Sequence, residues 1–276
     1  MFDVTGASAM ITPEREKKRA MKAADLFDLS GAVALVTGAS SGFGARFARV
    51  LAANGAKAVL VARRPEPLQS NLDAIRAAGG EAIAVSADVT TEAGIARAFD
   101  EAERAFGTVT ILINNAGTAH AAKLVDETRE GWARVMALNL DAVMFCAQEA
   151  ARRMIAAKKP GSIVNVASVL GLESQKAVAA YCTSKAGVLH LTRVMAHELA
   201  GKGIRVNALA PGYAVTELNR DYLHSPAGQA MIPDIPMRRF GEDGDLDGPL
   251  LLLASEAGRW MTGASVVVDG GHVLPL

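Results

Sequence analysis

Apolar and polar positions follow one another along the chain in blocks typical of strands alternating with helices. Seven short runs rich in Val, Ile and Ala predict buried strands, at 32–37, 58–62, 82–86, 111–114, 162–167, 205–210 and 265–268. Longer stretches between them predict helices over 45–53, 66–78, 91–106, 131–158, 178–200 and 248–255. This order predicts an α/β fold: a doubly wound, Rossmann-like sheet of seven parallel strands with helices on both faces.

Length and composition fit one folded domain. A chain of 276 residues, half of them apolar, can bury one large core, and no internal boundary is visible. We therefore predict a single Rossmann-fold catalytic domain over 29–276, preceded by an N-terminal extension over 1–28. The extension carries a basic stretch at 15–22, offset by nearby acidic residues, and we expect it to be solvated or packed on a partner.

Charge and cysteine content narrow the class of protein. Lys and Arg number 29, as do Asp and Glu, so no global charge favours nucleic acid or an anionic membrane. No apolar run approaches the ~18 residues of a membrane span, and the start does not resemble a signal peptide. The two cysteines, Cys146 and Cys182, are too few for a disulfide framework. We predict a cytoplasmic protein that binds neither nucleic acid nor membrane and holds no metal.

Tyr181 and Lys185 are the most informative pair in the chain. They are four residues apart in the predicted helix 178–200, so both side chains project from one face. A nearby ammonium favours the phenolate and lowers a phenol pKa that is ordinarily about 10. The pair therefore predicts a tyrosine that acts as a general acid or base near neutral pH.

A glycine-rich segment lies between the first predicted strand and the first predicted helix. Its glycines are spaced Gly-x-x-x-Gly-x-Gly. Such a turn lets backbone N–H groups at a helix N-terminus approach a pyrophosphate. The predicted contacts are Gly38, Ser40, Ser41, Gly42, Phe43 and Gly44.

These two motifs together resemble the short-chain dehydrogenase/reductase family. The glycine segment 37–44 and the segment 181–185 look like its two signatures, and further matches follow in the family's order, at 114–117, Asn139, Ser168 and 211–212. Ser168 precedes Tyr181 by thirteen residues, the separation that the family uses. The resemblance extends over 29–273, nearly the whole chain.

The resemblance implies interconversion of a ketone and a secondary alcohol by a nicotinamide cofactor. Tyr181 would exchange the proton, and Ser168 would donate a hydrogen bond to the reacting oxygen. Lys185 would bind the nicotinamide ribose and bias Tyr181 toward phenolate. The backbone of Asn139 would hold a water in the proton path, although a buried asparagine is also a common packing feature. Gln175 would join Ser168 and Tyr181 in contacting the substrate.

The resemblance also implies further cofactor contacts. Asp88 and Val89 would contact adenine, although Asp88 could equally cap the helix that begins near Thr91. Asn115, Ala116 and Gly117 would lie along the cofactor. The nicotinamide carboxamide would be bound by the turn made of Pro211, Gly212, Ala214 and Thr216.

The end of the second predicted strand bears on the choice of cofactor. NAD sites usually place an acidic residue there, but here Arg63 and Arg64 follow, with no acid before Glu66. Guanidinium groups suit the 2′-phosphate of NADP, so we predict NADP(H) and regard NAD as less favoured. Two alternatives weigh against this: both arginines could be merely solvated, and Ser41 stands where some NADP users carry another basic residue.

The sequence says less about the substrate and about partners. Residues 216–239 resemble the family's variable substrate lid and are rich in Leu, Ile and Met, which favours a neutral or modestly polar ketone. The family implies a homotetramer or homodimer that associates through helices 131–158 and 178–200. The alternative to an enzyme is a catalytically silent dinucleotide sensor or scaffold of the same fold.

Overall fold

The computed structural model describes residues 22–215 and 219–274. Most of the predicted N-terminal extension, with its basic stretch up to residue 21, lies outside these residues. So does Thr216, which was predicted to contact the carboxamide. The described end of the extension contains a short helix, α1 (Ala23–Phe27), which packs near the 3₁₀ turn Glu256–Gly258.

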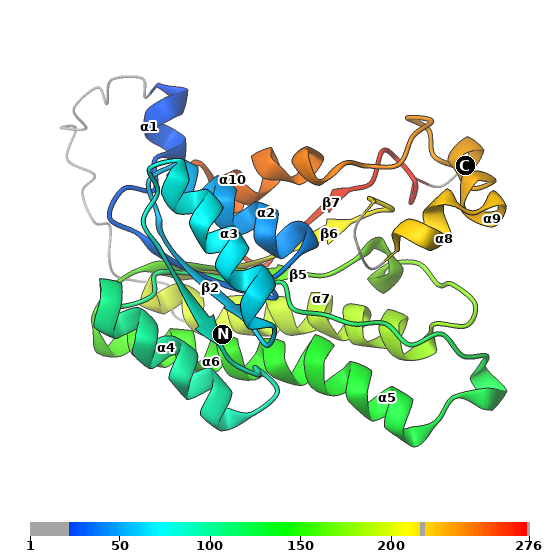
Figure 1. Cartoon of the computed structure of the whole chain (residues 1–276), viewed down its shortest axis with the longest axis horizontal. Helices are drawn as coiled ribbons and strands as arrows, with labels where there is room; N and C mark the ends of the chain where they lie inside the picture. Colours follow the sequence, from blue (N-terminus) through cyan, green and yellow to red (C-terminus); the bar gives the residue numbers. More distant parts are fainter. Residues whose placement is uncertain (1–21, 216–218, 275–276) are drawn as a thin grey trace, which may run out of the picture.

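A single seven-stranded sheet forms the centre of the molecule (Figure 1). Its order is β3-β2-β1-β4-β5-β6-β7, and every neighbouring pair is parallel. The predicted fold class is thus confirmed, and each predicted strand is correct to within one residue at either end. The strands are β1 (Val33–Thr37), β2 (Lys57–Ala62), β3 (Ala82–Ser86), β4 (Ile111–Asn114), β5 (Gly161–Val166), β6 (Ile204–Pro211) and β7 (Ser265–Val268).

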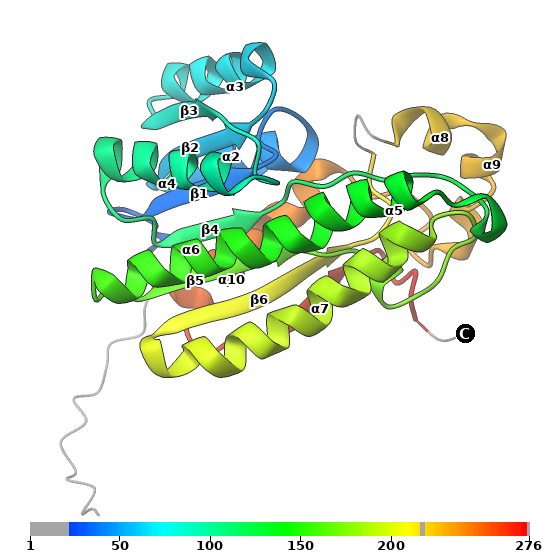
Figure 2. The same cartoon turned by 90° about the horizontal axis from the view of Figure 1, so that it is seen from below.

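Helices cover both faces of this sheet. One face carries α2 (Gly42–Ala53), α3 (Pro65–Ala77) and α10 (Asp247–Ala254); the other carries α4 (Glu92–Phe106), α6 (Ala142–Ala156) and α7 (Ala179–Leu199) (Figures 1 and 2). Strand residues alternate between the two layers, as the pleat requires. Ala34 and Val36 of β1 join the first layer, and Val33 and Leu35 join the second.

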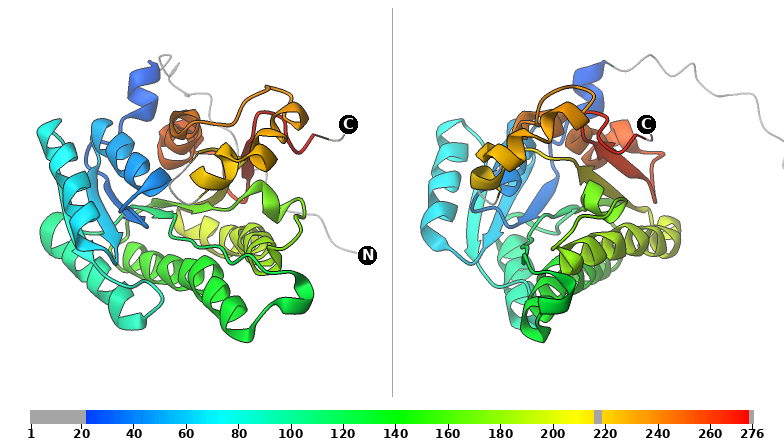
Figure 3. Two further views of the ribbon diagram at one scale, coloured as in Figure 1. Left: turned by 45° about the vertical axis from the view of Figure 1, so that its right-hand side comes forward. Right: turned by 90° about the vertical axis from the view of Figure 1, so that its right-hand side faces the viewer.

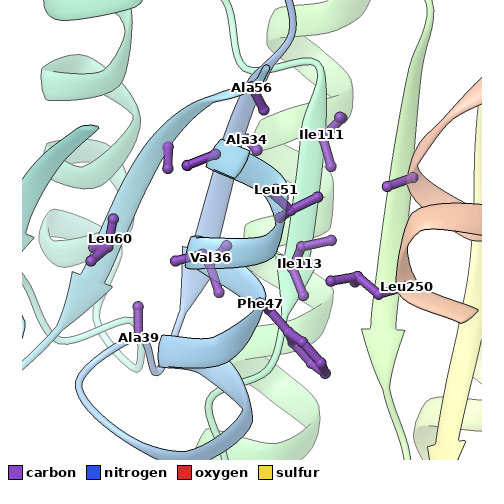
Figure 4. Packing of buried hydrophobic residues seen from close by; sticks show 14 of the residues in the cluster. Ala34, Val36, Ala39, Phe47, Leu51, Ala56, Leu60, Ile111, Ile113 and Leu250 are labelled. Atoms are coloured by element: carbon purple, nitrogen blue, oxygen red, sulfur yellow. The ribbon is translucent and has the colours of Figure 1, made fainter. Parts of the chain in front are cut away.

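The first layer illustrates why these sequences form helices. Phe47 and Leu51 lie one turn apart on α2, and both are fully buried against β1, β4 and Leu250 of α10 (Figure 4). Alanines occupy much of the facing strand surface, so α2 can approach the sheet closely. This packing fixes the position of the α2 N-terminus, which follows the glycine segment directly.

Buried amides join the strands beneath the site. The Asn114 side-chain Nδ2 donates to Asn165 Oδ1 at 2.9 Å, and Asn165 Nδ2 donates to Thr192 Oγ1 at 3.0 Å. These bonds connect β4, β5 and α7, and all three residues are buried. A buried amide must be satisfied in this way, so the bonds also hold the three elements in register.

The helix predicted over 131–158 is wrong as one continuous element. The chain forms α5 (Arg129–Met136), then a π-helical segment Ala137–Asp141, and then α6. A π turn contains an extra residue that a 3.6-residue hydrophobic period does not reveal, and such turns occur often at functional sites. Asn139 lies inside this segment and is fully buried.

The predicted lid has its own short helices. Its described part contains α8 (Arg220–His224), α9 (Pro226–Gln229) and the 3₁₀ turn Ile232–Asp234. Leu223 and Ile235 are buried, and the Met237 N–H donates to Gly270 O at 3.0 Å, so the lid packs beside the C-terminal turn (Figure 3). Among the described helices, none is both long and apolar enough to cross a bilayer.

Candidate active site

The glycine segment forms a tight turn between β1 and α2. Gly38 has φ +69°, and a Cβ there would lie 2.8 Å from Ala116 Cα, so only glycine fits. A Cβ on Gly44 would overlap the Gly38 carbonyl oxygen. Gly44 therefore allows α2 to pack against the turn.

The turn borders a cavity of about 630 Å³ at the carboxyl ends of the strands. Every predicted cofactor residue that the structure describes lines this cavity, with the exception of Gly44. Sequence reasoning missed several other lining residues: Val61, Ala62, Ala87, Thr118, Leu138, Val166, Ala167 and Asn219. The strand-end rule could have identified five of these, because they end or directly follow β2, β3 or β5. Leu138, Thr118 and Asn219 carry no such signal.

The loop after β4 is bonded to the end of β1. Thr37 Oγ1 accepts from the backbone N–H groups of Asn115 and Ala116, each at 3.0 Å. In return, Asn115 Nδ2 donates to the Thr37 carbonyl at 2.9 Å. These bonds hold the segment 115–117 against the glycine turn, and together they form one wall of the cavity.

Two arginines stand at the rim where β2 ends. Arg64 Nη2 donates to Ser40 Oγ at 3.2 Å and to Ser41 Oγ at 3.1 Å. Arg63 Nη1 lies 4.0 Å from Asp88 Oδ2 and is largely exposed. Cationic groups thus gather beside hydroxyl groups on one edge of the cavity, an arrangement suited to a phosphate.

Asp88 does not cap the helix that follows it. Thr91 is the N-cap of α4, where its side chain accepts from Gly94 N at 3.0 Å. Asp88 Oδ1 instead accepts from the Thr90 N–H at 3.0 Å, and this bond holds the pKa of Asp88 below its usual value. The capping alternative is therefore wrong, and Asp88 lines the cavity beside Val89.

Tyr181 and Lys185 lie together on the first turns of α7, as predicted. Lys185 Nζ lies 5.7 Å from the centre of the Tyr181 ring and donates to the Val166 carbonyl at 2.8 Å. The lysine is only 4 % exposed, and burial lowers its pKa to about 8.

The protein's own groups do not lower the pKa of Tyr181, contrary to our expectation. Burial raises this pKa, because desolvation disfavours the phenolate, and a hydrogen bond with Ser168 acts in the opposite direction. Lys185 does not offset the effect of burial on this pKa, since its amino group donates to the Val166 carbonyl. Tyr181 is therefore a protonated phenol at neutral pH.

Ser168 joins this pair at the end of β5. It opens a 3₁₀ turn, Val169–Gly171, and its Oγ accepts from Leu170 N at 3.1 Å. A Cβ on Gly171 would lie 2.7 Å from the Lys185 carbonyl carbon, so this turn packs directly on α7. Ser168, Tyr181 and Lys185 all line the same cavity.

Asn139 supports the site from behind and does not line the cavity. Its Oδ1 accepts from Thr118 N at 2.8 Å, while its Nδ2 donates to Thr118 O at 2.9 Å and Ser184 Oγ at 3.1 Å. Its side chain thus fixes the loop after β4 to α7. The predicted water held by its backbone stays a prediction.

Gln175 also lies outside the cavity lining. Its Oε1 accepts from the hydroxyl of Tyr213 at 3.0 Å. His224, on the lid, is exposed. Across 22–215 and 219–274, no three His, Cys, Asp or Glu side chains gather into a group that could hold a metal ion.

Known proteins match this chain over most of its length. The family model for short chain dehydrogenase matches residues 32–226. The chain is 39 % identical to galactitol 2-dehydrogenase (L-tagatose-forming) of Cereibacter sphaeroides, covering 90 % of this chain and 98 % of that one. It is 41 % identical to cis-4-hydroxycyclohexanecarboxylate dehydrogenase of Sinomonas cyclohexanicum, covering 87 % and 96 %.

A solved structure agrees with the sequence matches. Gluconate 5-dehydrogenase from Burkholderia cenocepacia, crystallised with NADP and tartrate, superposes with a TM-score of 0.88. It is 36 % identical, and the match covers 92 % of this chain and all of that one. The chain belongs to the short-chain dehydrogenases. It is an oxidoreductase that acts on alcohol and ketone groups with NAD(P).

The cavity of this short-chain dehydrogenase fits a dinucleotide. The glycine turn brings backbone close to the α2 N-terminus, where a pyrophosphate is favoured. Arg63 and Arg64 line this cavity, and so do Tyr181, Lys185 and Ser168. The predicted cofactor residues that the structure describes, apart from Gly44, therefore lie in one cavity.

The buried lysine predicts an unusual dependence of stability on pH. A pKa lowered from 10.5 to about 8 means that between these values the unfolded chain binds a proton that the folded chain lacks, so stability rises with pH. Below pH 8 the Lys185 amino group is charged in both the folded and the unfolded chain, so the folded chain carries the full free-energy cost of burying the cation. We expect the free energy of unfolding of wild type to rise relative to that of Lys185→Met by about 3 kcal/mol between pH 8 and pH 10.5.

Urea unfolding at stepped pH measures this difference. The raised pKa of Tyr181 lowers stability only above its ordinary value of 10 and is common to both proteins, so the difference isolates the lysine. Lys123→Met, at an exposed lysine, is the matched control and should show no such trend. A difference between Lys185→Met and wild type that stays constant over the range would contradict the prediction.

Proposed function

We propose that this chain is an NADP(H)-dependent oxidoreductase that interconverts a ketone and a secondary alcohol, with Tyr181 as the proton donor and acceptor. One observation carries the proposal: Ser168, Tyr181 and Lys185 line the same cavity as the glycine turn. We further propose that residues 29–276 form one catalytic domain, that 1–28 is an extension of it, and that the protein is cytoplasmic.

The residues divide the chemistry among them. When bound, NADP(H) supplies or accepts the hydride at the nicotinamide. In reduction, the neutral phenol of Tyr181 is the proton donor to the nascent alkoxide, and the Ser168 hydroxyl donates a hydrogen bond to the same oxygen. In oxidation, Tyr181 must first lose its proton, and the raised pKa of its phenol opposes that loss when the protein's own groups act alone. Lys185 would also bind the nicotinamide ribose, since it lines the same cavity and a Cβ on Gly117 would lie 3.7 Å from its amino group.

The preference for NADP rests on the rim at the end of β2. Arg64 donates to Ser40 and Ser41 there, with Arg63 next to it in the chain, and no acidic residue follows β2 directly to accept from a ribose 2′-hydroxyl. Asp88, the nearest carboxylate, faces Arg63. The NADP in the gluconate 5-dehydrogenase complex lends support to this choice.

The type of reaction is better defined than the identity of the substrate. The relatives named above act on galactitol and on cis-4-hydroxycyclohexanecarboxylate, so the family match alone does not select one compound. No observation favours the alternative, a catalytically silent dinucleotide sensor, because Ser168, Tyr181 and Lys185 line the same cavity. We also propose a homodimer or homotetramer, since α5, α6 and α7 carry exposed apolar side chains: Trp132, Phe145, Ile155 and Val194.

Tyr181→Phe tests the mechanism. Removal of the hydroxyl deletes the proton donor but keeps the ring, so we expect kcat for ketone reduction to fall by about 100-fold or more. The binding constant for NADPH, measured by fluorescence titration, should change little. Tyr222→Phe, on the lid, is the matched control and should retain activity. Ketone reduction that survives unaltered in Tyr181→Phe would show that the mechanism is wrong.

Arg63→Ala tests the cofactor preference. We expect NADPH to bind about 10- to 100-fold more weakly, because a charge-assisted contact to the 2′-phosphate is lost, while NADH binding stays within about twofold. Arg97→Ala, at an exposed position of α4, controls for loss of surface charge. Equal affinity of the wild type for NADH and NADPH at moderate salt would refute the preference.

Sedimentation velocity at micromolar concentration tests the oligomer. We expect a dimer or tetramer, and Phe145→Glu should weaken association because it places a charge on an apolar surface of α6. A monomeric wild type would refute the proposal.

A further inference from the structure

We propose that Asn71, a buried residue of α3, is a positioning residue for the glycine turn: its amide holds two carbonyl groups of the turn away from the cavity, so that the N–H groups of the same peptides face the 2′-phosphate of NADP(H). Arg49 of α2 fixes which way this amide faces. The inference rests on the proposed function, because it concerns the phosphate end of the same cofactor site.

Asn71 reaches the glycine turn from outside the cavity. It is only 9 % exposed and does not belong to the cavity lining, whereas Ser40 and Ser41 of the turn do. Its helix α3 lies beside α2, the helix that the turn opens (Figure 1). The side chain of Asn71 therefore meets the turn on the side away from the cofactor.

The amide of Asn71 bonds two successive peptide groups of the turn. Its Nδ2 donates to Ala39 O at 3.2 Å and to Ser40 O at 3.1 Å. The same nitrogen lies 3.1 Å from Pro67 O, one turn earlier on α3, to which it also donates. One side chain thus ties the turn to α3.

Arg49 determines the orientation of this amide. Its Nη2 donates to Asn71 Oδ1 at 3.0 Å. A guanidinium has no acceptor, so the amide atom that meets it must be the oxygen, and the NH₂ group must face the turn. Both polar atoms of the Asn71 amide then have partners, as its burial requires.

The direction of the two carbonyl groups fixes the direction of two N–H groups. In a trans peptide the C=O of one residue and the N–H of the next point opposite ways. With the Ala39 and Ser40 carbonyls held on Asn71, the N–H groups of Ser40 and Ser41 are turned away from it. Successive N–H groups in a turn attract an anion, whereas a carbonyl oxygen in their place would repel it.

The neighbouring cations indicate which phosphate these N–H groups serve. The hydroxyl groups of Ser40 and Ser41 accept from Arg64, which follows Arg63 at the end of β2. This is the edge of the cavity to which the 2′-phosphate is assigned above. The pyrophosphate is favoured at the α2 N-terminus, whose position depends on the packing of α2 against the sheet. Loss of the Asn71 amide should therefore affect NADPH more than NADH.

Asn71→Asp tests the proposal in the full-length protein. The carboxylate has the same shape and still accepts from Arg49, but it offers no donor to the Ala39 and Ser40 carbonyls. We expect the dissociation constant for NADPH, measured by fluorescence titration, to rise about 10- to 50-fold, with that for NADH within about threefold. At saturating NADPH, kcat for ketone reduction should stay within about twofold, a separation that general loosening of the fold would not produce.

A surface variant tests the same unit without a change in the core. Arg49→Met releases Asn71 Oδ1, so NADPH should bind about 2- to 5-fold more weakly. Asn71→Ala should weaken NADPH as Asn71→Asp does, and adding Arg49→Met to it should cause no further loss, because Arg49 acts through the amide. Arg49→Met decides the question if the buried substitutions prevent folding.

Two matched controls complete the design. Gln69→Ala removes another amide of α3, one that donates to Asp73 at 2.8 Å on the exposed side of the helix. Arg97→Met removes an exposed arginine of α4. Both variants should bind NADPH as wild type does.

Other outcomes overturn the proposal in distinguishable ways. Equal losses for NADPH and NADH, unchanged NADPH binding in Arg49→Met, or additive effects of Arg49→Met and Asn71→Ala would refute the role of Asn71 while the proposed oxidoreductase stands. A wild type that binds NADH as tightly as NADPH would contradict the proposed cofactor preference and this inference with it.

Discussion

A lysine amino group buried at the end of β5 determines the character of this active site. Lys185 reaches the Val166 carbonyl at 2.8 Å from the first turns of α7, and burial lowers its pKa to about 8. The cation is thus destabilised yet still present at neutral pH. Two glycines allow close packing around this lysine: a Cβ on Gly171 would lie 2.7 Å from its carbonyl carbon, and a Cβ on Gly117 would lie 3.7 Å from its amino group.

The second constraint is close backbone approach at the cofactor end. Gly38 packs against the loop after β4, and Gly44 packs against the Gly38 carbonyl, with the Asn115 side chain beside both, so β1, α2 and the end of β4 converge closely. Thr37 then bonds two N–H groups of that loop. Glycine is required here for space as much as for conformation, which explains why Gly44 matters without lining the cavity.

Support for the catalytic residues comes from a change in helix geometry. The π-helical segment Ala137–Asp141 carries Asn139, whose side chain joins Thr118 on one side and Ser184 on the other. The loop that borders the cavity is thereby attached to the helix that carries Tyr181 and Lys185. A small irregularity between α5 and α6 therefore affects the positions of groups on three separate elements.

The sequence by itself determined the fold class, the strand boundaries to within one residue, and most of the residues that line the cavity. It could do so because a two-residue alternation, a glycine turn and a four-residue helical spacing are local properties, and because parallel strands end at one edge. Only the tertiary structure decided the direction of the pKa of Tyr181, the capping of α4 by Thr91, the π segment, and the contact between Gln175 and Tyr213. These depend on burial and on distances between segments far apart in the chain, and neither quantity is set by local sequence.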